Sequence, residues 1–221
     1  MCISLRVSFL SCLLAACTLS GQGSGSPPSS VSNPHPAAVA RGAQYHLVPG
    51  QSLVTVLVRR GGVLARLGHD HVVASHAMTG HVSLEQRLAL LRIPLDSLSV
   101  DEPALRQAAG LDPEVSDEAI RGTRHNMQVH VLQTAHYPQA SVQVQCERDT
   151  FRHCHVEIEL HGVRHDYLIP LEVEATPDRL QASGFLTLKQ SDYGIVPLSV
   201  LGGALRVEDP VEISFRIVAE R

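Results

Sequence analysis

The clearest signal in the sequence is an alternation of apolar and polar residues with a period of two. Three stretches show it without interruption, at 140–147, 154–161 and 211–217. Because successive side chains of a strand point to opposite faces, each stretch predicts a strand with one face in the core and one in water. Less regular alternation predicts further strands at 52–59, 70–75, 78–84, 88–95, 166–173 and 179–189.

This many strands joined by short turns predict an all-β antiparallel fold, a sandwich or a barrel. Closure into a barrel of about eight strands removes the exposed edges of such a meander, so we expect a barrel. One stretch breaks the pattern: Ser116 is placed to cap a helix that carries Ile120, Met127 and Val131 on one face and ends before Pro138. The prediction is a barrel with one helical insertion.

The N-terminus carries the features of an export signal. A single positive charge at Arg6 precedes the apolar run 7–14 and small residues, which predicts a signal peptide over 1–16. The run is shorter than the roughly 20 residues of a membrane-spanning helix. The tetrapeptide ending at Cys17, LAAC, also resembles a bacterial lipobox, so we expect Cys17 to be lipidated; plain secretion is the alternative. Thr18 after the cysteine indicates the outer membrane, at its periplasmic face.

The next residues, 17–41, are rich in Gly, Ser, Pro and Asn. Such a composition cannot bury a core and predicts a disordered tether between the lipid anchor and a folded domain at 42–221. The net charge of −4 and the absence of a long basic run argue against nucleic acid as a partner.

Five short motifs within the domain carry a family resemblance. In order they are YHLVPGQS at 45–52, MTGHV at 78–82, HYP at 136–138, LHGVR at 160–164 and SDYGI at 191–195. Together they resemble the YceI-like family, whose members are lipocalin-like periplasmic barrels that bind polyisoprenoids or related long-chain amphiphiles. The resemblance spans about 45 to 219. It departs at Arg164, where the family more often has Lys or Thr, and at Tyr193, where it more often has Phe.

The interior as read from the alternation suits an aliphatic ligand. A barrel of about eight strands is wide enough for one small ligand, and the chain has no Trp, four Phe and four Tyr. We expect the ligand to be a polyisoprenoid, quinone-like or fatty acid derivative; a filled core without a cavity is the alternative. The positions expected to contact the ligand are Val142, Val144, Val156, Ile158, Leu171, Val173, Ile213 and Phe215.

The segment 68–71, Gly-His-Asp-His, is the most polar candidate site. On a strand, His69 and His71 share one side and Asp70 lies on the other. We expect these three residues to meet the head of the ligand at the mouth of the barrel. The alternative is a metal-binding protein with His69 and His71 as ligands, although a structural zinc site takes four.

Cys146 and Cys154 occupy core-facing positions on neighbouring predicted strands, with a turn near Thr150. In such a hairpin they face each other at the separation that a disulfide needs, and an exported compartment favours its formation. We therefore expect a disulfide; two free buried thiols are the alternative.

Signatures of catalysis are missing from the sequence. It has no Gly-x-Ser-x-Gly elbow, no His-Glu-x-x-His and no phosphate-binding loop. We expect a binding protein without a cofactor and without catalytic residues. A hydrolase with an unrecognised site, and a homodimer of the barrel, remain open.

Overall fold

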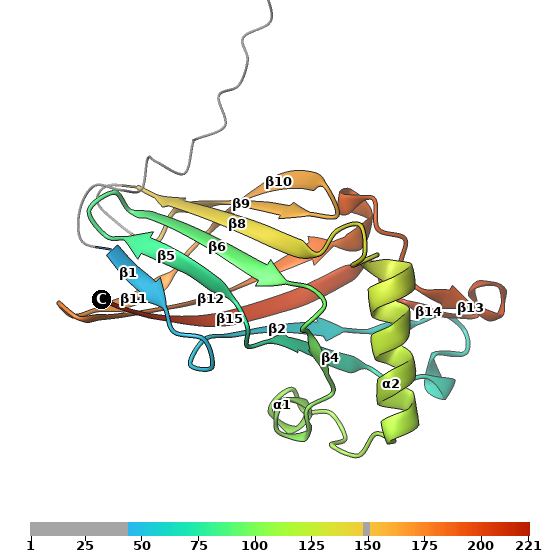
Figure 1. Ribbon diagram of the computed structural model, residues 1–221. Coiled ribbons are helices and arrows are strands. Elements are labelled where there is room, and N and C mark those ends of the chain that lie inside the picture. Colours follow the sequence, from blue (N-terminus) through green and yellow to red (C-terminus); the bar gives the residue numbers. More distant parts are fainter. Residues whose placement is uncertain (1–43, 148–150) are drawn as a thin grey trace, which may run out of the picture. The chain divides into compact units, whose positions relative to one another are not determined.

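The computed structural model describes residues 44–147 and 151–221 (Figure 1). The predicted signal peptide, the lipidation site Cys17 and the whole of the predicted tether lie outside the described residues. None of the helices within the described ranges is long and apolar enough to cross a membrane.

The chain folds mainly into antiparallel strands, as the alternation predicted. The strands are β1 Gln44–Leu47, β2 Leu53–Val58, β3 Arg60–Gly61, β4 His71–Ser75, β5 Thr79–Ser83, β6 Leu88–Pro94, β7 Ser99–Val100, β8 Gln139–Cys146, β9 Cys154–Leu160, β10 Val163–Ile169, β11 Glu172–Ala175, β12 Arg179–Lys189, β13 Ser199–Val200, β14 Leu205–Val207 and β15 Pro210–Glu220. The helices are α1 Pro103–Ala108 and α2 Asp117–Asn126, which continues as a π-helix over Met127–Val131; short 3₁₀ turns are η2 Ala65–Leu67, η4 Gln190–Tyr193 and η5 Leu201–Gly203.

Twelve strands form one large sheet and the other three form a small one. The large sheet runs β10–β9–β8–β6–β5–β1–β15–β2–β4–β7, with β12 also paired to β15 and β11 paired to β12. The small sheet has the order β13–β14–β3. Strand β15 is the centre of the large sheet, because it pairs with β12 along its whole length and with β1 and β2 on its other edge. The all-β antiparallel prediction is confirmed.

The expected closed barrel of about eight strands is wrong in two respects: the strand count differs and the sheet does not close. The stretch 166–173, expected to be one strand, is divided at Pro170. Before it, β10 pairs with β9; after it, β11 pairs with β12, and no backbone ladder joins β10 to β12 in the described part of the chain. Proline has no N–H to donate, so it stands where the pairing changes partner.

The helical insertion forms as predicted. The Ser116 hydroxyl accepts a hydrogen bond from the backbone N–H of Ala119 at 3.2 Å, which is the expected N-cap. Helix α1 is an additional element that the alternation did not indicate. In Figure 1, α2 stands at the end of the large sheet that lies nearest to β13 and β14.

Two of the sequence motifs meet at the turn between β9 and β10. His161 and Gly162 both adopt positive φ, 53° and 77°, which is typical of a two-residue hairpin turn. The Tyr137 ring lies 4.1 Å from the His161 ring, centroid to centroid. A Cβ at position 162 would lie 3.1 Å from the Tyr137 ring, so the glycine also permits this close packing.

Candidate functional site

A cavity of about 420 Å³ lies against the inner face of the large sheet. Its walls are almost entirely aliphatic side chains from β2, β4, β6, β8, β9, β12 and β15, and residues of α2 and the π-helix cover part of it. The positions that the alternation assigned to the interior all line this one cavity: Val142, Val144, Val156, Ile158, Leu171, Val173, Ile213 and Phe215. The structure thus contains a hollow interior, which the sequence had left open.

Strand register explains why these side chains share a wall. Val142 stands directly opposite Ile158, and Val144 stands opposite Val156, in the ladder between β8 and β9. Residues directly opposite in an antiparallel ladder point to the same face, so both pairs face inward. On the other wall, a Cβ at Gly184 would lie 2.7 Å from the Phe215 ring, so glycine there leaves room for that aromatic side chain.

One end of the cavity reaches the molecular surface. Most lining residues are buried or half-buried, and the exposed ones are Arg60, His69, Val200 and Arg206. These residues lie on or beside the small sheet β13–β14–β3. We call this opening the mouth.

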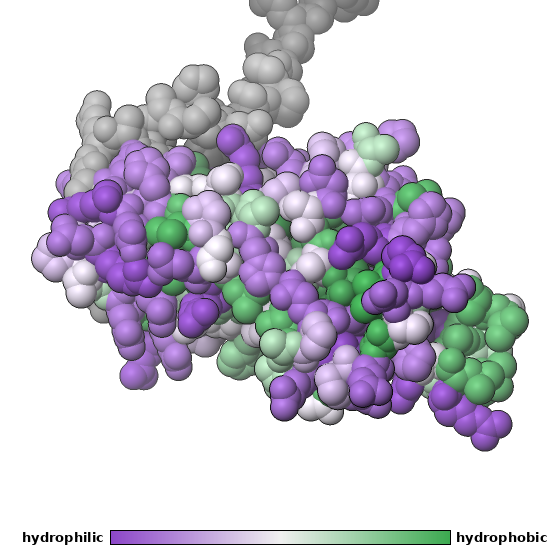
Figure 2. All heavy atoms as spheres, turned by 60° about the horizontal axis from the view of Figure 1, so that its bottom comes forward, coloured by the Kyte–Doolittle hydropathy of each residue, from purple (hydrophilic) through white to green (hydrophobic). Residues whose placement is uncertain are grey.

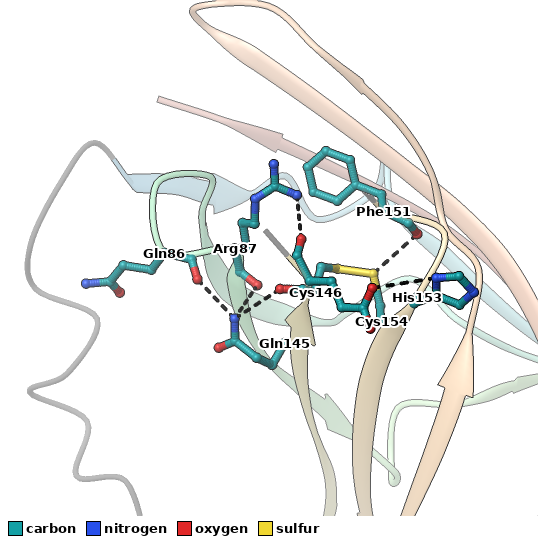
Figure 3. The surroundings of a disulfide bond; sticks show 8 residues. Gln86, Arg87, Gln145, Cys146, Phe151, His153 and Cys154 are labelled. Carbon is teal, nitrogen blue, oxygen red and sulfur yellow. Dashed lines mark hydrogen bonds and ion pairs between the residues drawn. A yellow bond between two sulfur atoms is a disulfide. The ribbon is translucent and has the colours of Figure 1, made fainter. Parts of the chain in front are cut away.

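At the other end, the hairpin between β8 and β9 carries a disulfide between Cys146 and Cys154 (Figure 3). The two cysteines are directly opposite in the ladder, with Cα atoms 4.0 Å apart. The Arg87 guanidinium lies 4.9 Å from the centre of the Phe151 ring, and its Nη1 donates to the Glu147 carbonyl at 2.7 Å. Cys146, Phe151 and Arg87 all line the cavity, so this hairpin forms part of its wall.

His69 and His71 both line the cavity, and His71 is held in place there by a buried carboxylate. Its Nδ1 lies 2.6 Å from Oδ2 of Asp101, a residue whose side chain is fully buried. Oδ1 of Asp101 accepts from Arg106 Nη1 at 2.7 Å and from the Val72 backbone N–H at 3.0 Å. The result is a chain of three groups, in which Arg106 and Asp101 are buried and His71 is half-buried.

The protonation of this chain follows from its contacts. Burial by itself would raise the pKa of Asp101, but the hydrogen bonds from His71, Val72 and Arg106 outweigh it and hold that pKa below its usual range. An ionised carboxylate only accepts hydrogen bonds, so Nδ1 of His71 must donate. Nε2 is then the polar atom of the ring that remains for a ligand.

Asp70 is placed differently from the expectation. Its carboxylate lies 3.4 Å from Arg59 and 3.6 Å from Arg60, and it accepts from the Arg60 backbone N–H at 3.0 Å. These arginines at the end of β2 and in β3 hold Asp70 away from the cavity lining. Asp101, and not Asp70, is the carboxylate that contacts His71.

The histidines do not form a metal centre with their surroundings. The ring centroids of His69 and His71 lie 6.5 Å apart. Within 44–147 and 151–221, no group of three or more His, Cys, Asp or Glu side chains is arranged to hold a metal ion. The geometry therefore offers no third ligand for the metal alternative in that part of the chain.

Sequence reasoning missed Asp101 and Arg106. Asp101 adopts a positive φ of 57° just before α1, and Arg106 lies on that short helix. Neither position stands out by spacing or motif, because Asp101 pairs with His71 and Val72, about 30 residues earlier, and Arg106 donates to the Asp70 carbonyl, 36 residues earlier. Only the packing of α1 beside β4 brings them together.

The SDYGI motif at 191–195 has a structural part in the cavity wall. Tyr193 is fully buried and its hydroxyl donates to the Tyr167 hydroxyl at 3.0 Å. Burial, together with this contact, raises the pKa of Tyr193. Gly194 follows with a φ of 68°, and the next residue, Ile195, lines the cavity.

Comparison with known proteins agrees with this architecture. A family model described as the YceI-like domain matches residues 45–219. No curated protein matches the chain.

Solved structures of similar fold include two with TM-scores above 0.5. A polyisoprenoid binding domain from Saccharophagus degradans, implicated in plant cell wall breakdown, has a TM-score of 0.56 at 17% identity, covering 80% of this chain and 97% of its own. BcnA from Burkholderia cenocepacia has a TM-score of 0.54 at 13% identity, covering 78% of this chain and 99% of its own. With a family model that matches most of its length and a fold that agrees, the chain belongs to the YceI-like family.

Proposed function

We propose that this protein binds a long-chain amphiphile in its cavity and acts as a lipid-anchored carrier or store in the periplasm. The observation that carries the proposal is the aliphatic cavity of about 420 Å³. The similar structure from Saccharophagus degradans is named a polyisoprenoid binding domain, which supports the same ligand class here. The lipobox-like LAAC ending at Cys17 supports anchoring.

The walls provide enough apolar surface for useful affinity. Each buried CH₂ group contributes about 0.8 kcal/mol, so a tail of about ten carbons gains about 8 kcal/mol before the cost of immobilising it. A net binding free energy of about 8 kcal/mol corresponds to a micromolar Kd. A longer isoprenoid or acyl tail gains more free energy from burial, and this gain offsets the conformational entropy that the tail loses on binding.

The head of the ligand is expected at the mouth, beside His71. In this proposal the His71 ring is neutral and its Nδ1 donates to Asp101. A neutral ring that donates from Nδ1 accepts at Nε2. We therefore expect a head with an O–H or N–H group, such as an alcohol, phenol or amide.

The principal test is organic extraction of the purified full-length protein followed by mass spectrometry, with metal analysis of the same sample. The expected result is one amphiphile in near-stoichiometric amount and no bound metal. An extract that matches a mock purification, together with no binding of added long-chain alcohols, would refute the proposal.

The head contact has its own test, the relative affinity for a long-chain alcohol and its methyl ether. The wild type should prefer the alcohol, and His71→Phe should lose that preference while it keeps affinity for the tail. His155→Phe, on the outward face of β9, is the matched control and should keep the preference. An unchanged preference in a folded His71→Phe protein would contradict the assignment.

A further inference from the structure

The end of the molecule around the mouth exposes an apolar surface. We define the tip as residues 60–69 and 196–207, which contain β3, η2, β13, η5 and β14. Figure 2 shows hydrophobic residues gathered at the end of the molecule where Figure 1 places β13 and β14. The exposed large apolar side chains of the tip are Val63 (88%), Leu67 (63%), Val196 (79%), Val200 (44%) and Leu201 (68%).

This concentration is not ordinary surface scatter. Single exposed apolar residues are common, whereas contiguous patches mark contacts with other phases or molecules. Five of the eight large apolar side chains that are exposed in the described part of the chain lie in the tip. Leu201 also adopts a φ of 53°, which leucine rarely occupies. Neither packing nor backbone preference accounts for leucine at that position.

The patch is continuous with the cavity. Every exposed residue among those that line the cavity lies in the tip, and Val200 belongs to both the patch and the lining. An apolar ligand that enters here can pass from the patch to the cavity wall by way of Val200. The patch should therefore contact an environment in which such a ligand already dissolves.

The charges of the tip favour an anionic surface. The tip carries Arg60, Arg66 and Arg206 and no Asp or Glu, on a chain whose net charge is −4. Two carboxylates flank it, Asp70 at 3.6 Å from Arg60 and Glu208 at 3.7 Å from Arg206, in partly exposed pairs that are weak in water. Long arginine side chains can reach lipid headgroups while their apolar neighbours lie deeper.

We propose that the tip inserts into the surface of a lipid bilayer that contains anionic lipids, so that the ligand passes between the membrane and the cavity without crossing water. The role in transfer rests on the proposed function; the contact with the membrane is tested without the ligand. This contact is additional to the N-terminal anchor, because it is made by the folded domain and orients the mouth towards the bilayer.

The absence of tryptophan from the chain allows a local test in the full-length protein. Val63→Trp places the single indole in the tip, and Phe185→Trp places it at a similarly exposed site (74%) on β12. With vesicles of phosphatidylcholine and phosphatidylglycerol, the Val63→Trp emission should shift to the blue and be quenched by brominated acyl chains. The Phe185→Trp emission should change in neither respect, even though both chains carry the same N-terminal segment.

Substitutions in the Val63→Trp chain test the surface itself. Leu67→Glu together with Leu201→Glu should abolish the quenching, since each leucine withdrawn from the bilayer weakens partitioning by about tenfold or more. Leu168→Glu, an exposed leucine on β10, is the matched control and should leave the quenching unchanged. Lower phosphatidylglycerol content or higher salt should reduce it.

Other outcomes exclude insertion of the tip, or separate its failure from the failure of the proposed function. Equal quenching of Val63→Trp and Phe185→Trp, or none in either, excludes insertion of the tip. A blue shift of Val63→Trp without vesicles that grows with protein concentration shows that a second copy covers the patch instead. If an amphiphile is extracted from the protein but the tip does not insert, the membrane contact is refuted and the proposed function stands. If the tip inserts but the protein neither yields nor binds an amphiphile, the proposed function is refuted and the membrane contact stands.

Discussion

Val156→Phe separates a hollow interior from a filled one. Val156 is 4% exposed, pairs with Val144 on β8 and Tyr167 on β10, and lines the cavity. In a filled core, a larger side chain forces its neighbours apart and costs about 1 to 3 kcal/mol. Beside a cavity of about 420 Å³, the ring can enter free space and make new apolar contacts.

The expected magnitude is set by the size of the domain. For a domain of 150 to 250 residues, 1 kcal/mol changes the Tm by about 2 to 4 °C, so overpacking a filled core would lower the Tm by about 2 to 12 °C. We expect Val156→Phe to change the Tm of the delipidated protein by less than about 2 °C. Val218→Phe is the matched control, because Val218 is 2% exposed and does not line the cavity, and it should show the full loss.

The assay is thermal unfolding of both variants and the wild type, before and after delipidation. A ligand present at about 100 times its Kd stabilises the folded state by about 2.7 kcal/mol, so bound lipid should raise the Tm of the wild type. The Val156→Phe protein should not co-purify with the amphiphile, and its Tm should therefore be the same before and after delipidation. A drop as large as that of Val218→Phe, with no lipid in the wild-type extract, would show that the interior is filled and refute the reasoning.

Three further perturbations test separate parts of the molecule. Cys17→Ser should abolish metabolic labelling with a fatty acid and release the protein into the soluble periplasmic fraction; a wild type without label contradicts lipidation. Alkylation of the denatured, unreduced protein should leave Cys146 and Cys154 unlabelled, and loss of their bridge should destabilise the fold by about 2 to 3 kcal/mol in the loop-entropy model, measured by urea unfolding. Asp101→Asn should cost about 3 to 5 kcal/mol, because it removes the charged partner of buried Arg106. The lowered pKa of Asp101 means that its contribution is complete above the ordinary value of 3.8 and is lost as the pH falls through the folded-state pKa, so wild-type stability should decline more steeply in acid than that of the variant.

Local patterns predicted the elements of this fold and much of the cavity wall. The alternation in 140–147 and 154–161 assigned side chains to faces, and the structure places the inward ones around one cavity. The Ser116 cap and the Tyr137-Pro138 stop located the helical insertion. These succeed because side-chain direction in a strand and capping at a helix end depend on neighbouring residues alone.

The head-group corner shows where local reasoning ends. His71 was expected at the ligand together with Asp70, but its carboxylate partner is Asp101, which α1 brings to β4. Charged side chains choose among all partners within reach, and Arg59 and Arg60 hold Asp70. Such choices depend on which segments pack together, so spacing in the sequence does not reveal them.

The sequence alone determined that the chain is all-β, which faces of its strands are apolar, and to which family its motifs are similar, because each follows from residues adjacent along the chain. Tertiary structure decided that the sheet stays open where Pro170 divides a strand between two partners. It also decided that the interior is hollow, and that the cavity opens at an apolar tip formed by 60–69 and 196–207. Closure, cavity volume and surface patches arise from contacts between distant segments, and no local period encodes them.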